Sequence, residues 1–241
     1  MQQRWMLGWV IAVAVVVFGL TWVRVDRTIV TLMAIAGLGP LWLLRWRGLI
    51  GQQGWPLTVL EILVVLQGGH TIEHLAQMYQ KYALGWASQD ASGLLSPLNA
   101  EIVHFVWNWS VAITVAYLLW SGVRNWAGVG LFAWSLAHAG EHTYLFWQYL
   151  GTLRTLAANG ASWALAQGQP GIFGIGGWAS RNDAVSAALF LCQPLGWGLT
   201  QTPRLELHFW WNFYEVLLVL LFAGVVWWQR RPTRSLDPIA A

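Results

Sequence analysis

Charged residues are scarce in this chain. Asp, Glu, Lys and Arg make up only 10% of its 241 residues, whereas hydrophobic residues make up 57%. Soluble domains contain roughly 25% charged residues, so the composition argues against an ordinary soluble fold and favours an integral membrane protein. The basic residues are scattered and form no basic stripe, which argues against nucleic acid as a partner.

Cysteines and processing signals are also nearly absent. The single Cys192 excludes an intrachain disulfide and does not indicate the redox compartment. The first apolar stretch follows Arg4 as it would in a signal peptide, but no small-residue cleavage site comes after it. We therefore expect this stretch to be an uncleaved membrane anchor.

Long apolar stretches, in contrast, recur along the chain. A helix needs about 20 predominantly apolar residues to cross a bilayer. We predict six transmembrane helices, at residues 5–23, 28–44, 55–79, 98–120, 126–150 and 205–228. The sequence thus predicts an all-α integral membrane protein, a single membrane domain (residues 1–241) surrounded by the lipid bilayer of the cell membrane.

The placement of arginine predicts the orientation. With six spans both termini lie on one side of the membrane, and the short segments on that side are rich in arginine. These arginines are Arg4, Arg45, Arg47, Arg124, Arg230, Arg231 and Arg234. Because cytoplasmic segments carry an excess of Lys and Arg, we expect both termini in the cytoplasm and the long connection at residues 151–204 outside.

The chain also contains an internal repeat. Residues 55–121 and residues 125–229 each contain His-x-x-Glu-His, a connection, and then His-Phe-x-Trp-Asn at the start of the next predicted helix. Both halves begin on the same side, so the predicted repeat is parallel and forms a four-helix metal-binding bundle. Residues 1–50 form two anchor helices outside it. We expect the connection 151–204 to cap the outer face, the alternative being a surface for a partner subunit.

All six histidines belong to the two copies of this pattern. They fall at one depth, near the outer ends of the predicted helices. The i, i+4 spacing places both histidines of a pair, and the Glu between them, on one helix face. Ionisable side chains within a bilayer mark functional sites. We predict as metal ligands His70, Glu73, His74, Glu101, His104, His138, Glu141, His142 and His208.

Three further polar residues lie deeper on the same helix faces: Asn108, Asn212 and Glu215. We predict that they contact the ligands and do not bind the metal themselves. Glu206 is not predicted as a ligand, because it lies about 200° around the helix from His208. Packing is the competing interpretation, since a single buried histidine is commonly a packing residue and an intramembrane Asn often bonds a neighbouring helix. Six histidines with several carboxylates at one depth are hard to reconcile with packing, because burying them is costly.

These residues predict a membrane metalloprotein with a His/Glu-ligated, dinuclear centre near the extracytoplasmic side. We expect an oxidoreductase that acts on O2 or a lipophilic substrate. Mixed histidine and carboxylate ligation favours iron, with zinc or copper as alternatives. The histidine pairs resemble the His-x-x-x-His boxes of integral-membrane desaturases and alkane hydroxylases, although those families contain more histidines, including His-His doublets, and place their sites at the cytoplasmic face. Two separate mononuclear sites remain an alternative to one dinuclear site.

Other functions remain open at this point. A zinc hydrolase would use Glu73 or Glu141 as the base that activates a metal-bound water. A metal-ion or proton-coupled transporter would use the inward polar stripe. A haem- or chlorophyll-binding subunit of a larger membrane complex would use the histidines as axial ligands, but the Glu within each pair argues against it. Further membrane subunits, or a second copy of the chain, are the protein partners that such a chain could take.

Overall fold

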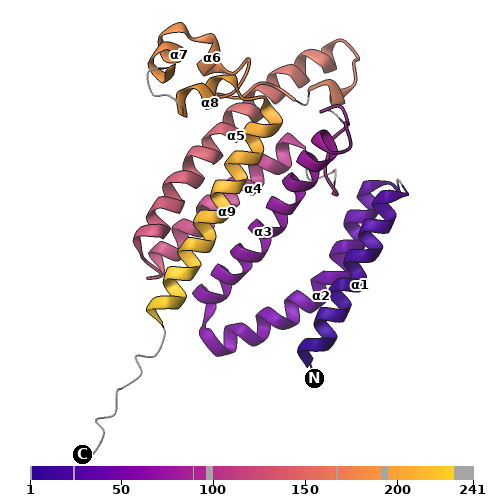
Figure 1. Cartoon of the computed structure of the whole chain (residues 1–241), viewed down its shortest axis with the longest axis vertical. Coiled ribbons are helices and arrows are strands. Elements are labelled where there is room, and N and C mark those ends of the chain that lie inside the picture. Colours follow the sequence, from indigo (N-terminus) through magenta and orange to yellow (C-terminus); the bar gives the residue numbers. More distant parts are fainter. Residues whose placement is uncertain are drawn as a thin grey trace, which may run out of the picture.

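The computed structural model describes residues 2–23, 25–88, 90–95, 100–166, 168–190 and 195–230. These residues form helices, turns and loops, and no strand, which confirms the all-helical prediction for the part of the chain described. Figure 1 shows the start of α1 and the end of α9 at one end of the molecule, and a small helical cap at the other end.

The first two helices form a hairpin beside the rest of the molecule (Figure 1). They are α1 (Gln2–Trp22) and α2 (Arg27–Gln53), and α2 contacts α3 (Trp55–Tyr82). Gly54 alone separates α2 from α3, and its φ of 81° is a conformation that favours glycine. Nε of Arg45 donates to Oε1 of Glu61 at 2.8 Å, which joins α2 to α3 a second time.

Four helices make up the bundle: α3, α4 (Glu101–Trp120), α5 (Trp126–Ala158) and α9 (Arg204–Gln229). The helix α4 packs against α5, while α9 packs against both α3 and α5. Local signals set the helix starts. Pro56 occupies the first turn of α3, where no backbone N–H is lost, and the Asn125 side chain caps α5 by accepting from the Gly128 N–H at 2.9 Å.

The apolar core fills the end of the bundle at which α4 joins α5. It contains the first turns of α3 and α5 and the last turns of α4 and α9. Its buried members are Leu57, Leu60, Leu63, Val111, Val115, Leu118, Val123, Ala127, Leu131, Val219, Phe222, Ala223 and Val226. The buried polar side chains concentrate in the other half of the bundle, so the bundle is divided along its length into an apolar half and a polar half.

The cap is built by the connection between α5 and α9. It contains the 3-10 helix η2 (Trp163–Ala166) and the short helices α6 (Trp178–Arg181), α7 (Asp183–Phe190) and α8 (Leu195–Gln201). Figure 1 shows α6, α7 and α8 grouped at the end of the molecule remote from the start of α1.

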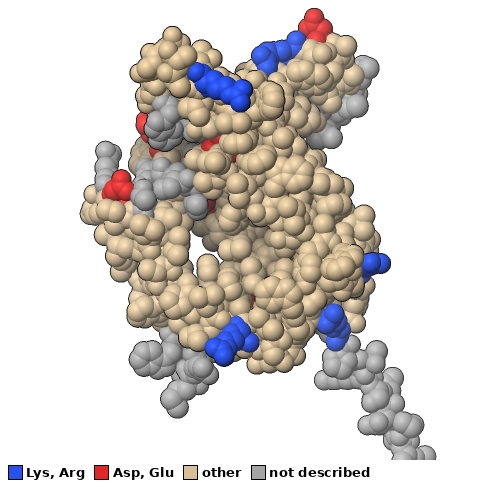
Figure 2. Space-filling model, turned by 180° about the vertical axis from the view of Figure 1, so that it is seen from behind, with Lys and Arg blue, Asp and Glu red and all other residues tan. Residues whose placement is uncertain are grey.

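Within the described residues, four helices are long and apolar enough to cross a membrane: Ile29–Gln53, Trp55–Tyr82, Glu101–Trp120 and Arg204–Gln229. A shorter apolar helix covers Gly8–Leu20. The helix α5 does not meet the same criterion, yet it packs between α4 and α9. Uncharged side chains cover most of the face shown in Figure 2. Helices occupy all six predicted spans where the chain is described, and the count of six remains a prediction.

Cysteine labelling tests the predicted orientation. The exposed Asp183 lies in the cap and the exposed Arg124 lies between α4 and α5. After replacement of the native Cys192, which lies outside the described residues, we expect an impermeant maleimide added outside the cell to label Asp183→Cys and not Arg124→Cys. The positive-inside bias is the physical reason. The opposite labelling pattern would place the cap in the cytoplasm and contradict the orientation.

Candidate metal centre

The six histidines converge from four helices into one cluster in the polar half of the bundle. The rings of each touching pair have centroids between 4.4 and 6.0 Å apart. Five of the rings belong to buried residues and His208 is partly buried. The contributions are His70 and His74 from α3, His104 from α4, His138 and His142 from α5, and His208 from α9.

Two groups of histidines within this cluster could each hold a metal ion. The first contains His70, His74, His104 and His208, and the second contains His138, His142 and His208. Within each group the candidate ligand nitrogens all lie within 4.8 Å of one another. Two nitrogens bound to one ion at about 2.1 Å are at most about 4.2 Å apart, so modest side-chain adjustment suffices. His208 belongs to both groups.

Two of the rings are held on the side remote from the cluster. Nδ1 of His74 lies 2.8 Å from Oε1 of Gln77, and Nδ1 of His138 lies 3.1 Å from Oε2 of Glu215. A histidine that binds metal through one nitrogen is commonly oriented by such a bond to the other. These contacts therefore leave Nε2 of both rings for the interior of the cluster.

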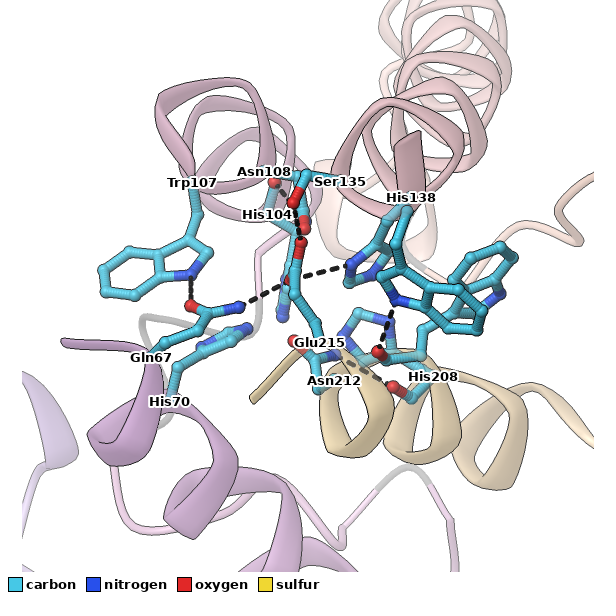
Figure 3. Close-up of polar contacts among 12 residues, drawn as sticks. Gln67, His70, His104, Trp107, Asn108, Ser135, His138, His208, Asn212 and Glu215 are labelled. Atoms are coloured by element: carbon cyan, nitrogen blue, oxygen red, sulfur yellow. Dashed lines mark hydrogen bonds and ion pairs between the residues drawn. The ribbon is translucent and has the colours of Figure 1, made fainter. Parts of the chain in front are cut away.

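Glu215 is fully buried and accepts three hydrogen bonds (Figure 3). Its donors are Nε2 of Gln67 at 2.5 Å, Oγ of Ser135 at 2.7 Å and Nδ1 of His138 at 3.1 Å. Nε1 of Trp107 in turn donates to Oε1 of Gln67 at 2.9 Å. The structure thus places Glu215 directly behind a histidine, within a polar network that links all four bundle helices.

Gln67 and Ser135 were missed by the sequence reasoning, although a signal for both of them existed. Gln67 lies three residues before His70, and Ser135 lies three residues before His138. Residues three apart share a helix face, so these two polar residues extend each histidine face inward by one turn.

Several ring nitrogens in the cluster lack a partner. Among the described residues, four buried ring nitrogens have no hydrogen-bond partner: Nε2 of His138, both ring nitrogens of His142, and Nε2 of His208. A buried polar atom left unpaired costs about 1–3 kcal/mol. All three rings belong to the second histidine group, so a bound metal ion would satisfy nitrogens that the protein itself does not.

The glutamates within the two His-x-x-Glu-His motifs bind backbone amides instead of joining the histidines. Oε2 of Glu73 accepts from the Leu94 N–H at 2.9 Å and its Oε1 accepts from the Leu95 N–H at 2.8 Å. Both oxygens of Glu141 lie 3.1 Å from the Ile172 nitrogen. Neither glutamate belongs to a histidine group, so in the described part of the chain both candidate metal sites consist of imidazoles.

The other acidic residues near the cluster form ion pairs. Glu101, a predicted ligand, pairs with the guanidinium of Arg204 and also lies in neither histidine group. Nη1 of Arg204 donates to the Gln169 carbonyl at 2.9 Å, which connects this pair to the cap. Glu206 accepts hydrogen bonds from Lys81 and Tyr82. Its absence from the histidine groups agrees with the helical geometry of the sequence prediction.

The two asparagines make the same local contact in both halves. Nδ2 of Asn108 donates to the His104 carbonyl at 2.8 Å, and Nδ2 of Asn212 donates to the His208 carbonyl at 2.8 Å. Both asparagines are buried. Each side chain thus binds the backbone of the histidine one turn earlier on its own helix.

Comparison of the chain with protein-family models, with curated proteins and with solved structures finds no match. The chain is therefore described by its own fold and site: a helical protein with apolar helices of membrane-spanning length and buried clusters of histidine that could bind metal.

Proposed function

We propose that the chain is a membrane metalloenzyme in which the two histidine groups bind two neighbouring transition-metal ions. The observation that carries this proposal is the convergence of six imidazoles. Four of their buried ring nitrogens have no hydrogen-bond partner within the described part of the chain. Because His208 belongs to both groups, the two ions would lie close together. A dinuclear centre is thus supported over two separate sites.

The ligand number favours a reactive centre over a structural one. The first group contains four histidines and the second contains three, and His208 is counted in both. The two groups therefore cannot supply four separate protein ligands to each ion. Catalytic sites commonly keep such an open position for water or substrate, whereas structural sites are closed. We therefore propose an oxidoreductase that acts on O2 or a lipophilic substrate supplied by the bilayer.

The ligand atoms limit the choice of metal. Imidazole suits zinc, copper, iron and nickel. The preference for iron rested on mixed ligation with carboxylate, and Glu73, Glu101 and Glu141 are bound to backbone amides or to arginine. The geometry therefore supports copper as strongly as iron for a redox centre, with zinc as the choice for a hydrolase.

The transporter is less well supported. An ion leaving the cluster along the bundle would have to pass the apolar core, which includes the fully buried Leu60, Val115 and Phe222. Thr58 is the one buried polar side chain on α3 between the N-terminus of that helix and Gln67 in the described chain. Partially dehydrated ions are strongly disfavoured in such surroundings.

Metal analysis of the purified protein tests the proposed function. We expect two transition-metal ions per chain, and no Soret absorption band because touching imidazole rings leave no slot for a porphyrin. Elemental analysis and the visible spectrum give both readings. Zinc as the sole metal would favour a hydrolase, a Soret band would favour a haem subunit, and a metal-free protein that takes up no added metal would contradict the proposal.

A further inference from the structure

We propose that Glu73 and Glu141 are positioning residues, which anchor two segments of backbone over the histidine cluster. The first cover segment is residues 93–95 and the second is residues 171–173. Each carboxylate stands on the helical turn that carries a histidine pair, and each accepts hydrogen bonds from backbone N–H groups of its segment. The proposal rests on the proposed function only for the metal beneath the segments.

The first cover segment is held by two side chains of α3. The two oxygens of Glu73 each accept from a different N–H, those of Leu94 and Leu95. About two turns further along α3, the Gln80 side chain makes two hydrogen bonds with Gly93: its Nε2 donates to the Gly93 carbonyl at 2.9 Å, and its Oε1 accepts from the Gly93 N–H at 2.8 Å. Carboxylate acceptors make the stronger kind of hydrogen bond, so Glu73 is the principal anchor.

Glycine permits the close approach. The φ of Gly93 is 79°, and a Cβ at that position would overlap the Glu73 carboxylate. A Cβ on Gly171 would likewise overlap the Glu141 carboxylate, although the φ of Gly171 lies outside the left-handed region. A larger residue at position 171 would therefore displace the Glu141 carboxylate, although the backbone conformation there does not itself favour glycine.

The second cover segment is fixed to the cap on its other side. The Trp178 N–H donates to the Gly171 carbonyl at 3.0 Å, and the Ala179 N–H donates to the Ile172 carbonyl at 2.8 Å. The hydrogen bond from the Ile172 N–H to Glu141 therefore joins the cap to α5, one residue before His142. Movement of the cap away from the cluster would have to break this contact.

The two halves thus use the motif in one way. In each, the histidines face the cluster while the Glu between them faces a cover segment whose first residue is a glycine. Closing a site with backbone excludes water and strengthens electrostatic interactions inside. The Glu of His-x-x-Glu-His therefore retains and protects the metal without ligating it directly.

The variant Gly171→Ala distinguishes an anchoring role of Glu141 from a ligand role. It displaces the contact between Glu141 and the second cover segment without removing any possible metal ligand. The variants are Gly171→Ala, Glu141→Ala and Glu141→Gln, with Gly198→Ala as the control, since a Cβ on Gly198 meets nothing within 4 Å. Metal content after purification and the rate of metal loss to EDTA are measured for each. We expect Gly171→Ala and Glu141→Ala to retain near-normal metal content but to lose it at least about tenfold faster, the effect of one charge-assisted hydrogen bond. Glu141→Gln should fall between them and the wild type, and Gly198→Ala should match the wild type.

Other outcomes overturn the inference. Purified Glu141→Ala that contains no second metal, together with a normal Gly171→Ala, would make Glu141 a ligand. Equal rates of metal loss in all variants would exclude an anchoring role. Hydrogen exchange of residues 168–176 tests the anchor even in a protein without metal. There, faster exchange in Gly171→Ala than in Gly198→Ala supports the anchor and unchanged exchange contradicts it, independently of whether the proposed function holds.

Discussion

Replacement of His208 by Ala is expected to remove both metal ions, the largest loss of metal among single histidine variants. His208 is the one histidine that belongs to both groups. Its removal leaves three histidines in the first group and two in the second. Even the partners that orient a ligand contribute tenfold to 100-fold in affinity, so we expect the loss of a shared ligand to weaken each site by at least about 100-fold.

Elemental analysis of purified variants checks this expectation. His138→Ala and His70→Ala each remove a member of only one group, and we expect each to retain the ion of the other group. His142→Ala should lower metal content more than His74→Ala, since it leaves a group of two where His74→Ala leaves a group of three. The repeat by itself would predict equal losses from those two changes.

Trp210→Ala is the matched control for His208→Ala. Trp210 lies two residues further along α9, is 45% exposed and belongs to neither group, so its removal should leave the metal content unchanged. A His208→Ala protein that folds and still binds two ions would contradict the shared position of His208. Loss of metal in Trp210→Ala as well would show that the loss is not specific to His208, which also contradicts its assignment as a shared ligand.

Convergence of the histidines was predictable because it depends on local geometry. Side chains four residues apart share a helix face, and the apolar stretches fix which part of each helix lies at a common depth. Those two rules sufficed to bring His70 and His74 together with His138 and His142 in one cluster. The same rule of facing separated Glu206 from the cluster.

The direction of the carboxylates could not be predicted, because it depends on loops. Glu73 bonds backbone amides 21 and 22 residues further along the chain, and Glu141 bonds one that is 31 residues away. Glu101 pairs with Arg204, which is 103 residues away. A helical projection predicts on which face of its helix each Glu lies. It does not predict the direction of the flexible side chain, which depends on where the loop places its hydrogen-bond donors.

Helix ends were the other feature that hydropathy did not define. The second predicted span stops at residue 44, whereas α2 continues to Gln53 through Arg45 and Arg47. The fifth stops at residue 150, whereas α5 continues to Ala158. Arginine lowers hydropathy but is a good helix former, so the apolar stretch ends before the helix does.

Replacement of Glu215 by Ala is expected to produce the largest loss of stability among changes outside the histidines. It would leave Nε2 of Gln67, Oγ of Ser135 and Nδ1 of His138 without their acceptor in a fully buried site. Each of these three stranded groups costs about 1–3 kcal/mol. We therefore expect a decrease of at least about 3 kcal/mol in the free energy of unfolding.

Thermal unfolding in detergent, with metal analysis of the same samples, measures the effect. Val219→Ala is the control, because Val219 is fully buried one turn further along α9 but belongs to the apolar core. Val219→Ala should lower the free energy of unfolding by about 1–3 kcal/mol, through the loss of buried apolar surface and the cavity left behind. It should retain both metal ions. Glu215→Ala should also lose the ion of the second group, since His138 loses the bond that orients its ring.

A double-mutant cycle separates the network from the cavity. Ser135→Ala removes one donor to Glu215, so Glu215→Ala should destabilise the Ser135→Ala protein less than the wild type. Residues that share a buried network couple by about 0.5–3 kcal/mol. Additive effects of the two changes, or a Glu215→Ala protein as stable and as metal-rich as Val219→Ala, would show that Glu215 fills space without supporting His138. A coupled loss would identify the carboxylate as the acceptor that holds the second histidine group in place.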